Sequence, residues 1–554
     1  MFPASSTLAK SIDSKWYDWM NKYFFILILL FFLNQASYSA IKNKILESGD
    51  TQCNLLILGG GYSASGNEVS LESNVRYLHR QKNEIGLSNF KTRILFSDGV
   101  DSARDIKYRD PSFSVPETNL LLAEIFGSTR GIYNQYRNNR LQADGMSSIK
   151  DFNDWLRDVN ASSKRTSNLI YFTGHGGKGE KKTPYNTTAY LWNNYKFRVS
   201  DFTKKLDTLP SDQSFILVMV QCYSGGFANF IFREGDSKKG LHPQVRAGFF
   251  ATVHDRVAAG CTPDIREENY QEYSTHFWEA LCGESRIGKK IQKPDFNGDG
   301  STSLTEAHAY VIIHSNTIDI PIKTSDVFLR RFSSFEPPKE ENPVTDLIRN
   351  AKDLLSGTDS NSSKQEIIDN HWLLKTDPIS KILVKASPES KAIIEALAQR
   401  LSLHSEKLFQ ETEDKIKEIK KERDDLAKTK KEKDDLKKKI KGKIKARLLK
   451  EWPELANIQH PAVDALKKSD ESTKMITLAN QDNEWSDYKK RREESLKIEN
   501  QRFILEKRQV LAMRLNHEIE NVVLKDALPK INSSDIIERY NLIEELEKTI
   551  FSKP

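Results

Sequence analysis

The chain has 554 residues, of which 38% are hydrophobic and 29% are charged, and its formal net charge is +7. This length exceeds that of one ordinary domain, so we expect more than one folded region. The four cysteines form no CxxC pair and the eleven histidines form no HExxH motif, which argues against a zinc enzyme.

The first 40 residues have the proportions of an export signal. Lys15 and Lys22 precede an apolar run from Tyr23 to Leu33, and small residues suited to cleavage follow at Ala36, Ser39 and Ala40. The run is shorter than the ~20 residues that a membrane span needs. We therefore expect residues 1–40 to be a signal peptide and the protein to be exported, periplasmic or secreted. An uncleaved membrane anchor is the alternative.

Residues 41–334 alternate between strand-like and helix-like patterns. Short apolar runs typical of buried strands occur at Leu55 to Leu58, Ile94 to Phe96, Leu169 to Phe172, Phe215 to Val220 and Phe249 to Val253. Helical patterns lie between them, as at Val69 to Leu78 and Asp151 to Val159. This alternation predicts an α/β domain with a mostly parallel sheet and helices on both faces.

A glycine-rich segment follows the first predicted strand. Gly59-Gly60-Gly61-Tyr62-Ser63-Ala64 fits a loose dinucleotide-binding fingerprint. However, no acidic residue ends a second strand about 20 residues on, as that fingerprint requires. A nucleotide-binding protein is thus a weak alternative, and we expect no organic cofactor.

Two segments set 47 residues apart each carry a reactive side chain between an apolar strand and glycines. Tyr171-Phe172-Thr173-Gly174-His175-Gly176-Gly177 is the first, and Val218-Met219-Val220-Gln221-Cys222-Tyr223-Ser224-Gly225-Gly226 is the second. Each segment alone is more typical of a turn or of a core cysteine. Together they place His175 and Cys222 at the carboxyl ends of strands, where open α/β sheets bind ligands.

These residue types suit a catalytic dyad. An unperturbed cysteine titrates near pH ~8.5, and a neighbouring imidazole can withdraw its proton or stabilise its thiolate. Gly176 has no β-carbon, so a scissile carbonyl could approach the main chain closely. The backbone N–H groups of Gly176 and Cys222 are then the candidate oxyanion hole.

At these residues the chain resembles the caspase-like cysteine peptidases, and within them the legumain (haemoglobinase) branch most. The resemblance extends to Gly248-Phe249-Phe250-Ala251-Thr252-Val253, Ala258-Ala259-Gly260-Cys261 and Tyr273-Ser274-Thr275-His276-Phe277-Trp278-Glu279, and it covers roughly residues 50–330. It implies a caspase/haemoglobinase-like fold and a cysteine endopeptidase that acts through His175 and Cys222. The histidine about 50 residues before the cysteine fits this family.

The residues that would set legumain specificity differ in this chain. Legumains carry two acidic residues and one basic residue around an asparagine side chain. The matching places here are Val220, Gln271 and the uncharged run Ser63-Ala64-Ser65-Gly66. The resemblance therefore implies peptidase chemistry without asparaginyl or aspartyl specificity. Glu68, Asp255 and Asp264 could favour a basic substrate side chain, although each is more typical of a solvated or capping acid.

Residues 295–306 satisfy the calcium-loop pattern D-x-[DN]-x-[DN]-G-x5-E in full. Calcium needs about six to eight oxygen ligands. The spacing offers the side chains of Asp295, Asn297 and Asp299, the carbonyl of Ser301, a water-bridged Ser303 and a bidentate Glu306. Pro294 argues against a regular entering helix, so we expect a structural Ca²⁺ clip rather than a complete EF-hand. A metal-free polar turn is the alternative.

Cys53, Cys222, Cys261 and Cys282 are the four cysteines, and a free Cys222 leaves an odd three. A bridge between Cys261 and Cys282 is plausible in an oxidising compartment, but the sequence does not establish it.

The composition changes near Phe335, where a polar linker over residues 335–365 begins. Residues 366–554 are rich in Lys and Glu and read as helix, with a possible coiled coil. Residues 415–447 contain 16 basic and 7 acidic side chains, so the excess positive charge of the chain lies there. We expect a solvated helical face, with an anionic surface or an acidic partner as the alternative.

These observations predict an exported cysteine endopeptidase that cleaves protein or peptide substrates and binds calcium. Legumains also have a helical carboxyl-terminal region that covers the active site, so we expect residues 366–554 to dock on the peptidase domain or restrain it. A catalytically silent binding or scaffold protein of the same fold is the main alternative.

Overall fold

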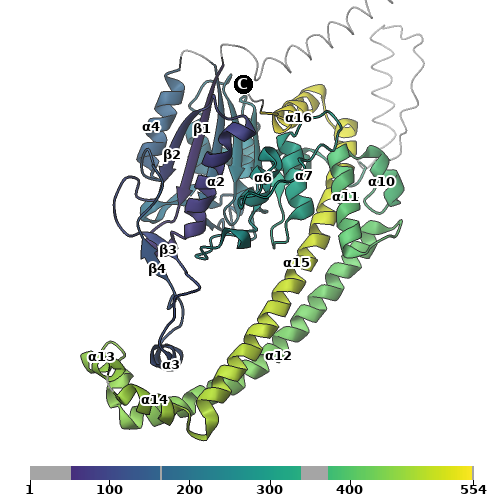
Figure 1. The fold of residues 1–554 in the computed structure, drawn as a ribbon. Coiled ribbons are helices and arrows are strands. Elements are labelled where there is room, and N and C mark those ends of the chain that lie inside the picture. The colour runs from purple at the N-terminus through teal and green to yellow at the C-terminus, as the bar shows by residue number, and fades with distance from the viewer. Residues whose placement is uncertain (1–50, 163–164, 338–371, 469, 552–554) are drawn as a thin grey trace, which may run out of the picture.

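The structure is a computed structural model that describes residues 51–162, 165–337, 372–468 and 470–551. The predicted signal peptide and residues 338–365 of the predicted linker lie outside these ranges. The described chain comprises an α/β domain and a long helical region that leaves it and returns to it (Figure 1). Within the described residues, no helix is both long and apolar enough to cross a membrane.

Six strands form the main sheet in the order β11-β10-β9-β5-β1-β2. All neighbouring pairs are parallel except β10 with the edge strand β11. The strands are β1 (Thr51–Gly60), β2 (Lys91–Phe96), β5 (Arg165–Gly174), β9 (Ser214–Met219), β10 (Arg246–Phe250) and β11 (Ile322–Lys323). The predicted α/β class with a mostly parallel sheet is therefore confirmed.

Side chains alternate between the two faces of the sheet, as the period of two in a strand requires. Leu56 and Ile170 pack on one face with helices α4 (Ile149–Asn160), α5 (Val199–Leu206) and α8 (Thr324–Phe332). Their neighbours Leu55 and Leu169 pack on the other face with α2 (Val69–Ile85), α6 (Tyr273–Cys282) and α7 (Leu304–His314). Helices thus cover both faces, and the strand runs are apolar because both faces are buried.

Smaller elements gather where the parallel strands end. They are the antiparallel pair β3 (Ile106–Tyr108) and β4 (Gln135–Arg137), and the small sheet of β6 (Gly176–Gly177), β7 (Thr188–Leu191) and β8 (Tyr195–Arg198). The excursion between β3 and β4 carries helix α3 (Glu117–Phe126) far from the sheet (Figure 1).

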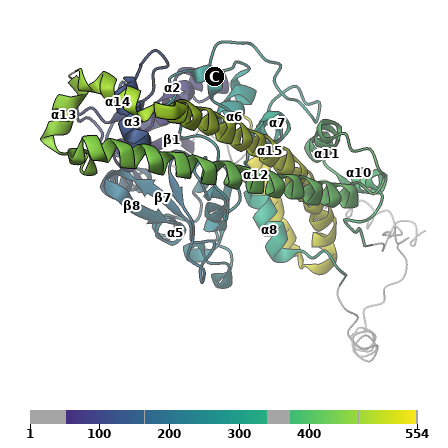
Figure 2. The ribbon, with the colours of Figure 1, turned by 90° about the horizontal axis from the view of Figure 1, so that it is seen from below.

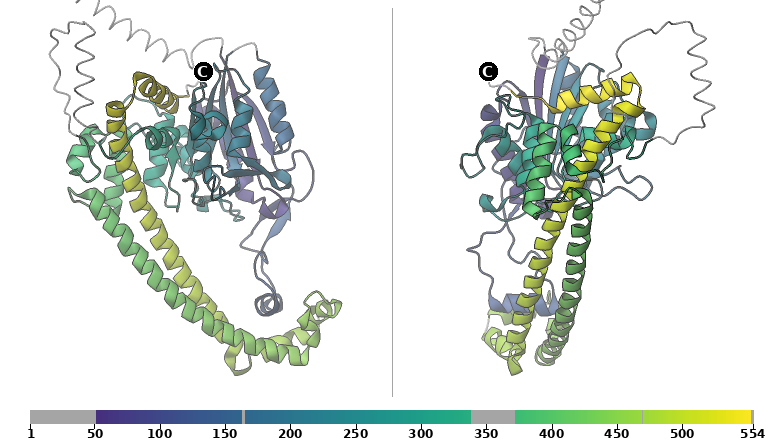
Figure 3. Two further views of the ribbon diagram at one scale, coloured as in Figure 1. Left: turned by 180° about the vertical axis from the view of Figure 1, so that it is seen from behind. Right: turned by 90° about the vertical axis from the view of Figure 1, so that its right-hand side faces the viewer.

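The carboxyl-terminal region is helical, as predicted. Its helices are α10 (Ile379–Lys385), α11 (Pro388–Leu401), α12 (Leu408–Glu451), α13 (Pro461–Lys468), α14 (Glu471–Ala479), α15 (Glu484–Ile531) and α16 (Ser534–Glu547). The long helices α12 and α15 run side by side as a hairpin, which we call the arm (Figure 3). Seen from below, the arm crosses the α/β domain (Figure 2).

Both ends of the arm are anchored to the α/β domain. Leu524 and Leu528 of α15 join the core cluster that contains Phe328 of α8, together with Tyr540 of α16. At the far tip, the apolar face of α3 packs against residues of α12, α14 and α15. The helical region therefore shares its core with the α/β domain, and the carboxyl edge of the sheet lies toward the concave side of the arm (Figure 1).

Candidate active site

His175 and Cys222 lie just beyond the carboxyl ends of two neighbouring strands. β5 ends at Gly174 and β9 ends at Met219, and the two strands pair in parallel. The two chain segments touch here, because a β-carbon on Gly176 would lie only 1.9 Å from the Cys222 carbonyl oxygen. A glycine is therefore required after His175, for close approach of the backbone rather than for an unusual φ.

The His175 imidazole is held by the loop that follows β1. Its Nε2 lies 2.8 Å from the Gly66 carbonyl oxygen and 2.9 Å from Glu68 Oε2. The Tyr62 ring packs edge-on against the imidazole, with 5.1 Å between the ring centroids. Both oxygens accept a hydrogen bond, so Nε2 carries the proton and Nδ1 is the nitrogen left for a thiol.

Glu68 links this imidazole to a cation. It precedes α2 at the N-cap position, and its side chain is only 8% exposed. Lys107 Nζ of β3 lies 2.7 Å from Glu68 Oε1. The carboxylate is thus neutralised on one side by Lys107 and orients His175 on the other. Glu68 does not act as a capping acid, because its side chain accepts no hydrogen bond from a backbone N–H of the helix.

Cys222 occupies a strained turn. The Ser224 amide donates to the Gln221 carbonyl, which closes a turn around Cys222 and Tyr223. Tyr223 has φ +61°, a left-handed conformation that is uncommon for residues other than glycine. The turn is held from outside, since the Tyr223 amide donates to the Arg256 carbonyl at 2.8 Å. Such imposed strain is frequent at functional sites.

The thiol of Cys222 faces the segment that follows β10. The Ala258 amide donates to Cys222 Sγ at 3.3 Å. Burial raises the pKa of the Cys222 thiol, while the Ala258 amide and the nearby His175 act to lower it. In the described part of the chain, the backbone N–H of Cys222 donates no hydrogen bond.

Cys261 is a second thiol at the same imidazole. Its backbone has φ +50°, and its Sγ donates to the Gly174 carbonyl at 3.6 Å. Burial alone would lower the pKa of His175. The charge of Cys261 and its hydrogen bond to the imidazole, together with Glu68, outweigh burial and raise that pKa to about 11. His175 is therefore placed to be an imidazolium beside the Cys261 sulfur and the Glu68 carboxylate.

The arm supports the segment that carries Ala258 and Cys261. Asp319 is fully buried and its Oδ1 accepts from the Ala259 amide at 2.6 Å. Arg514 of α15, only 2% exposed, donates from Nε to the Asp319 carbonyl at 2.7 Å and from its other nitrogens to Ile312, Ser315 and Thr317. Three hydrogen bonds thus link a buried residue of the carboxyl-terminal region, through Asp319 and the Ala258-Ala259 backbone, to the Cys222 sulfur.

The cysteines are all free thiols in the structure. Cys261 lies beside His175, whereas Cys282 at the end of α6 contacts the Tyr77 hydroxyl, 3.6 Å away. A bridge between Cys261 and Cys282, which the sequence left open, is therefore absent. The two thiols have different partners on the protein.

The loop 295–306 adopts a closed polar turn. The amides of Asp299 and Gly300 donate to Asp295, and the Asp299 amide also donates to Asn297 Oδ1. Glu306 is fully buried and accepts from the amides of Phe296, Asn297 and Ser303. With Ser303 it forms a capping box at the start of α7. The Ser301 amide donates to the side chain of Asp299, two residues earlier.

This loop has the side-chain oxygens of a calcium site, but they are engaged by backbone amides. Among the described residues, no group of three His, Cys, Asp or Glu side chains is gathered so that it could hold a metal ion. The capping box explains Ser303 and Glu306 without a metal. Asp295, Asn297 and Asp299 converge on one turn and remain the residues to test for Ca²⁺.

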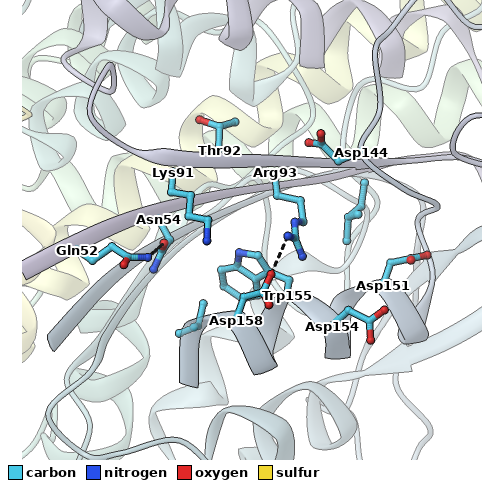
Figure 4. Close-up of a pocket in the computed structure, with 12 residues that line it drawn as sticks. Gln52, Asn54, Lys91, Thr92, Arg93, Asp144, Asp151, Asp154, Trp155 and Asp158 are labelled. Carbon is cyan, nitrogen blue, oxygen red and sulfur yellow. Dashed lines mark hydrogen bonds and ion pairs between the residues drawn. The ribbon is translucent and has the colours of Figure 1, made fainter. Parts of the chain in front are cut away.

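A polar hollow of about 430 Å³ lies at the other end of the sheet (Figure 4). Gln52 and Asn54 at the start of β1 line it, and Arg93 of β2 pairs with Asp158 of α4 across it at 2.7 Å. It is separate from His175 and Cys222, which follow the opposite ends of the strands.

The sequence does not point to Lys107 or Cys261 as members of the site. It offers Glu68 as an acid that could favour a basic substrate side chain, whereas the structure pairs Glu68 with His175, 107 positions away. Asp264 fits the simpler interpretation, because it pairs with the exposed Arg266. The glycine-rich segment after β1 supplies Tyr62 and leads to Gly66, so in this fold it encloses His175.

Neither the known protein families nor the curated proteins include a match to this chain.

Proposed function

We propose that this protein is a cysteine endopeptidase that uses Cys222 as nucleophile and His175 as general base and acid. The observation that carries the proposal is the pairing of two neighbouring strand ends, one bearing an imidazole oriented by Glu68 and the other a thiol in a strained turn. This arrangement of nucleophile, base and orienting group is the one that acyl transfer requires.

In the proposed reaction, His175 takes the proton of the Cys222 thiol, and the sulfur attacks the carbonyl carbon of a peptide bond. The backbone N–H groups of Gly176 and Cys222 are the candidate donors to the oxyanion. His175 delivers a proton to the leaving amine, and a thioester on Cys222 remains. His175 then removes a proton from water, which attacks the thioester and releases the carboxylic acid and the thiol.

The surroundings of the site define its electrostatics. Glu68 favours the imidazolium form of His175, and an imidazolium favours an adjacent thiolate. Both acids around the site, Glu68 and Asp319, already hold protein groups. Neither is free to bind a charged side chain next to the scissile bond.

Four further proposals accompany this function. The protein is exported by residues 1–40, and the turn around Asp295, Asn297 and Asp299 binds Ca²⁺ as a structural clip. The basic helical region docks on the α/β domain of the same chain and restrains the active site through the contact of Arg514 with Asp319. An anionic surface is a second candidate partner for residues 415–447.

One observation favours the alternative of a catalytically silent binding protein. Burial raises the pKa of Cys222, and the thiol to which His175 is hydrogen-bonded is Cys261. In that case Cys222 would be a poor nucleophile at neutral pH.

A positional peptide library distinguishes the two. We expect the full-length protein to cleave members of the library, and the Cys222→Ala and His175→Ala variants to lose cleavage. Cleavage that persists in Cys222→Ala would remove the nucleophile assignment, and no cleavage by the wild type, with or without added calcium, would favour the silent protein.

A further inference from the structure

Another hollow, of about 510 Å³, lies beside the edge strand β2. It is on the opposite side of that strand from the hollow drawn in Figure 4, in which Thr92 points away from Arg93 (Figure 4). Helix α2 supplies one wall, and residues 140–144, which follow β4, supply the other. Neither His175 nor Cys222 lines it, so the hollow is separate from the candidate active site.

Three guanidinium groups and an imidazole line this hollow. Arg76, His79 and Arg80 lie on α2 at spacings of three and four residues, so they share one face of the helix, and all three are exposed. Arg140, also exposed, lines the other wall. Like charges four residues apart on a helix repel each other. The arrangement therefore destabilises α2 unless an anion offsets the charge.

The acid that would ordinarily pair with Arg76 is engaged elsewhere. Glu72 lies four residues before Arg76, the spacing at which an acid and a base on a helix pair. Glu72 is instead fully buried, where it accepts from the Arg137 guanidinium at 3.0 Å and from the Arg140 amide at 2.6 Å. Within the ranges that the structure describes, the side chains of Arg76 and Arg140 take part in no hydrogen bond or ion pair.

The hollow contains one carboxylate, which is partly engaged. Asp144 lines the hollow, and its Oδ2 accepts from the Ile94 amide of β2 at 2.7 Å. Arg80 donates to a neutral group, the Arg286 carbonyl, at 3.0 Å. Three guanidinium groups thus face a single carboxylate that already holds a backbone N–H. The hollow keeps a net positive charge.

The chemistry of the lining favours an anion with several charges. A guanidinium group binds phosphate through two parallel N–H···O bonds. The volume falls within the ~300–1,000 Å³ of small-molecule sites. A single carboxylate would neutralise one of the three guanidinium groups, and a cation or an apolar molecule would neutralise none. Linked phosphate groups bring several charges and many acceptor oxygens into a space of this size.

We propose that this hollow binds a small ligand that carries two or more linked phosphate groups. Arg76 and Arg140 bind phosphate oxygens from the two walls, and His79 and Arg80 donate to further oxygens. The ligand thereby joins α2 to the segment that follows β4. The inference does not depend on the peptidase function, because none of these residues belongs to the candidate active site.

The test is isothermal titration calorimetry on the full-length protein at about 0.15 M ionic strength, where charges more than ~8 Å apart are largely screened. Tripolyphosphate and adenosine triphosphate are the probes, and they distinguish an inorganic from an organic source of the phosphate chain. Orthophosphate and citrate are the comparison anions. The test variant combines Arg76→Gln with Arg140→Gln. The control combines Lys438→Gln with Lys439→Gln, which removes the same charge from exposed positions of the basic segment 415–447.

We expect saturable binding of one or both probes, with a Kd at least tenfold lower than that of orthophosphate or citrate. The arginine variant should weaken this binding at least tenfold, and the lysine control should change it less than twofold. The absence of saturable binding to the wild type would overturn the inference. Equal weakening by the two variants would also overturn it, because the anion would then respond only to net charge. Citrate binding as tight as that of the probes would overturn the phosphate class.

A second measurement on the wild type does not depend on how well the arginine variant folds. Phenylglyoxal modifies accessible arginines, and peptide mass spectrometry gives the rate at each one. We expect saturating tripolyphosphate to slow the modification of Arg76 and Arg140 at least fivefold and to leave Arg508, exposed on α15, unchanged. Equal rates at Arg76 and Arg140 with and without the probe would place any binding elsewhere and overturn the inference.

Discussion

Glu68 Oε2 lies 2.9 Å from His175 Nε2, and this contact joins the loop after β1 to the end of β5. It places a proton on Nε2 and leaves Nδ1 as the nitrogen that can serve a thiol. A carboxylate behind an imidazole that serves a nucleophile is the arrangement of a triad. The relationship gives Glu68 a positioning role in the proposed mechanism.

Glu68→Gln keeps the size of the side chain and removes its charge. We expect kcat/KM to fall at least about tenfold, because the amide no longer stabilises the imidazolium. The pKa of His175 should also fall, since Glu68 contributes to raising it. Steady-state kinetics across pH measures both effects. Asp101→Asn, at an exposed position after β2, is the control and should change neither.

Cys261→Ser removes the second sulfur from His175 and keeps a small polar side chain. Cys261 raises the pKa of His175, so its loss should lower that pKa. An imidazolium–thiolate pair is lost as pH rises through the histidine pKa, and this loss should therefore move to lower pH in the variant. The rate of Cys222 alkylation by iodoacetamide, measured against pH with Cys53→Ser as control, reports the shift. A profile that does not move would show that Cys261 does not govern His175.

Arg514→Met leaves the carbonyls of Ile312 and Asp319 without their donor. Leaving buried hydrogen-bond acceptors unpaired costs about 1–3 kcal/mol each, so we expect a loss of several kcal/mol in the free energy of unfolding. Urea denaturation measures it. Arg508→Met, an exposed position on the same helix, should stay within about 0.5 kcal/mol of the wild type. Equal stability of the two variants would contradict a structural link between the arm and the site.

The loop 295–306 can be tested by separating metal binding from helix capping. Glu306→Gln should destabilise the protein by about 1 kcal/mol with or without calcium, because the capping box is weakened in either case. Asp295→Ala combined with Asp299→Ala should abolish any rise in melting temperature that calcium produces. If neither calcium nor a chelator changes the melting temperature of the wild type, the proposed clip is contradicted.

The sequence predicted the sheet well because its strands are buried on both faces. Runs such as Leu55 to Leu58 and Phe215 to Val220 are apolar throughout, and they became β1 and β9. The glycines after His175 and Cys222 marked where the strands stop, so the positions of these two residues at the carboxyl edge followed directly.

The other members of the site were not predictable in this way. Glu68 precedes a helix, where an acid is ordinarily explained by capping. Cys261 reaches His175 only through the packing of the segment after β10 on β5. The helical pattern of α15 was readable, but an amphipathic pattern does not say which surface it meets. The contact of Arg514 with Asp319 is determined by tertiary packing and not by the local sequence.

The central claim is that Cys222 is the nucleophile. Its most direct measurement is mass spectrometry of the intact protein and its tryptic peptides after reaction with a peptidyl acyloxymethyl ketone, chosen from the preferred library sequence. We predict one adduct per molecule on Cys222, absent from His175→Ala. An adduct on Cys261 instead, or one on Cys222 that forms equally without His175, would contradict the account.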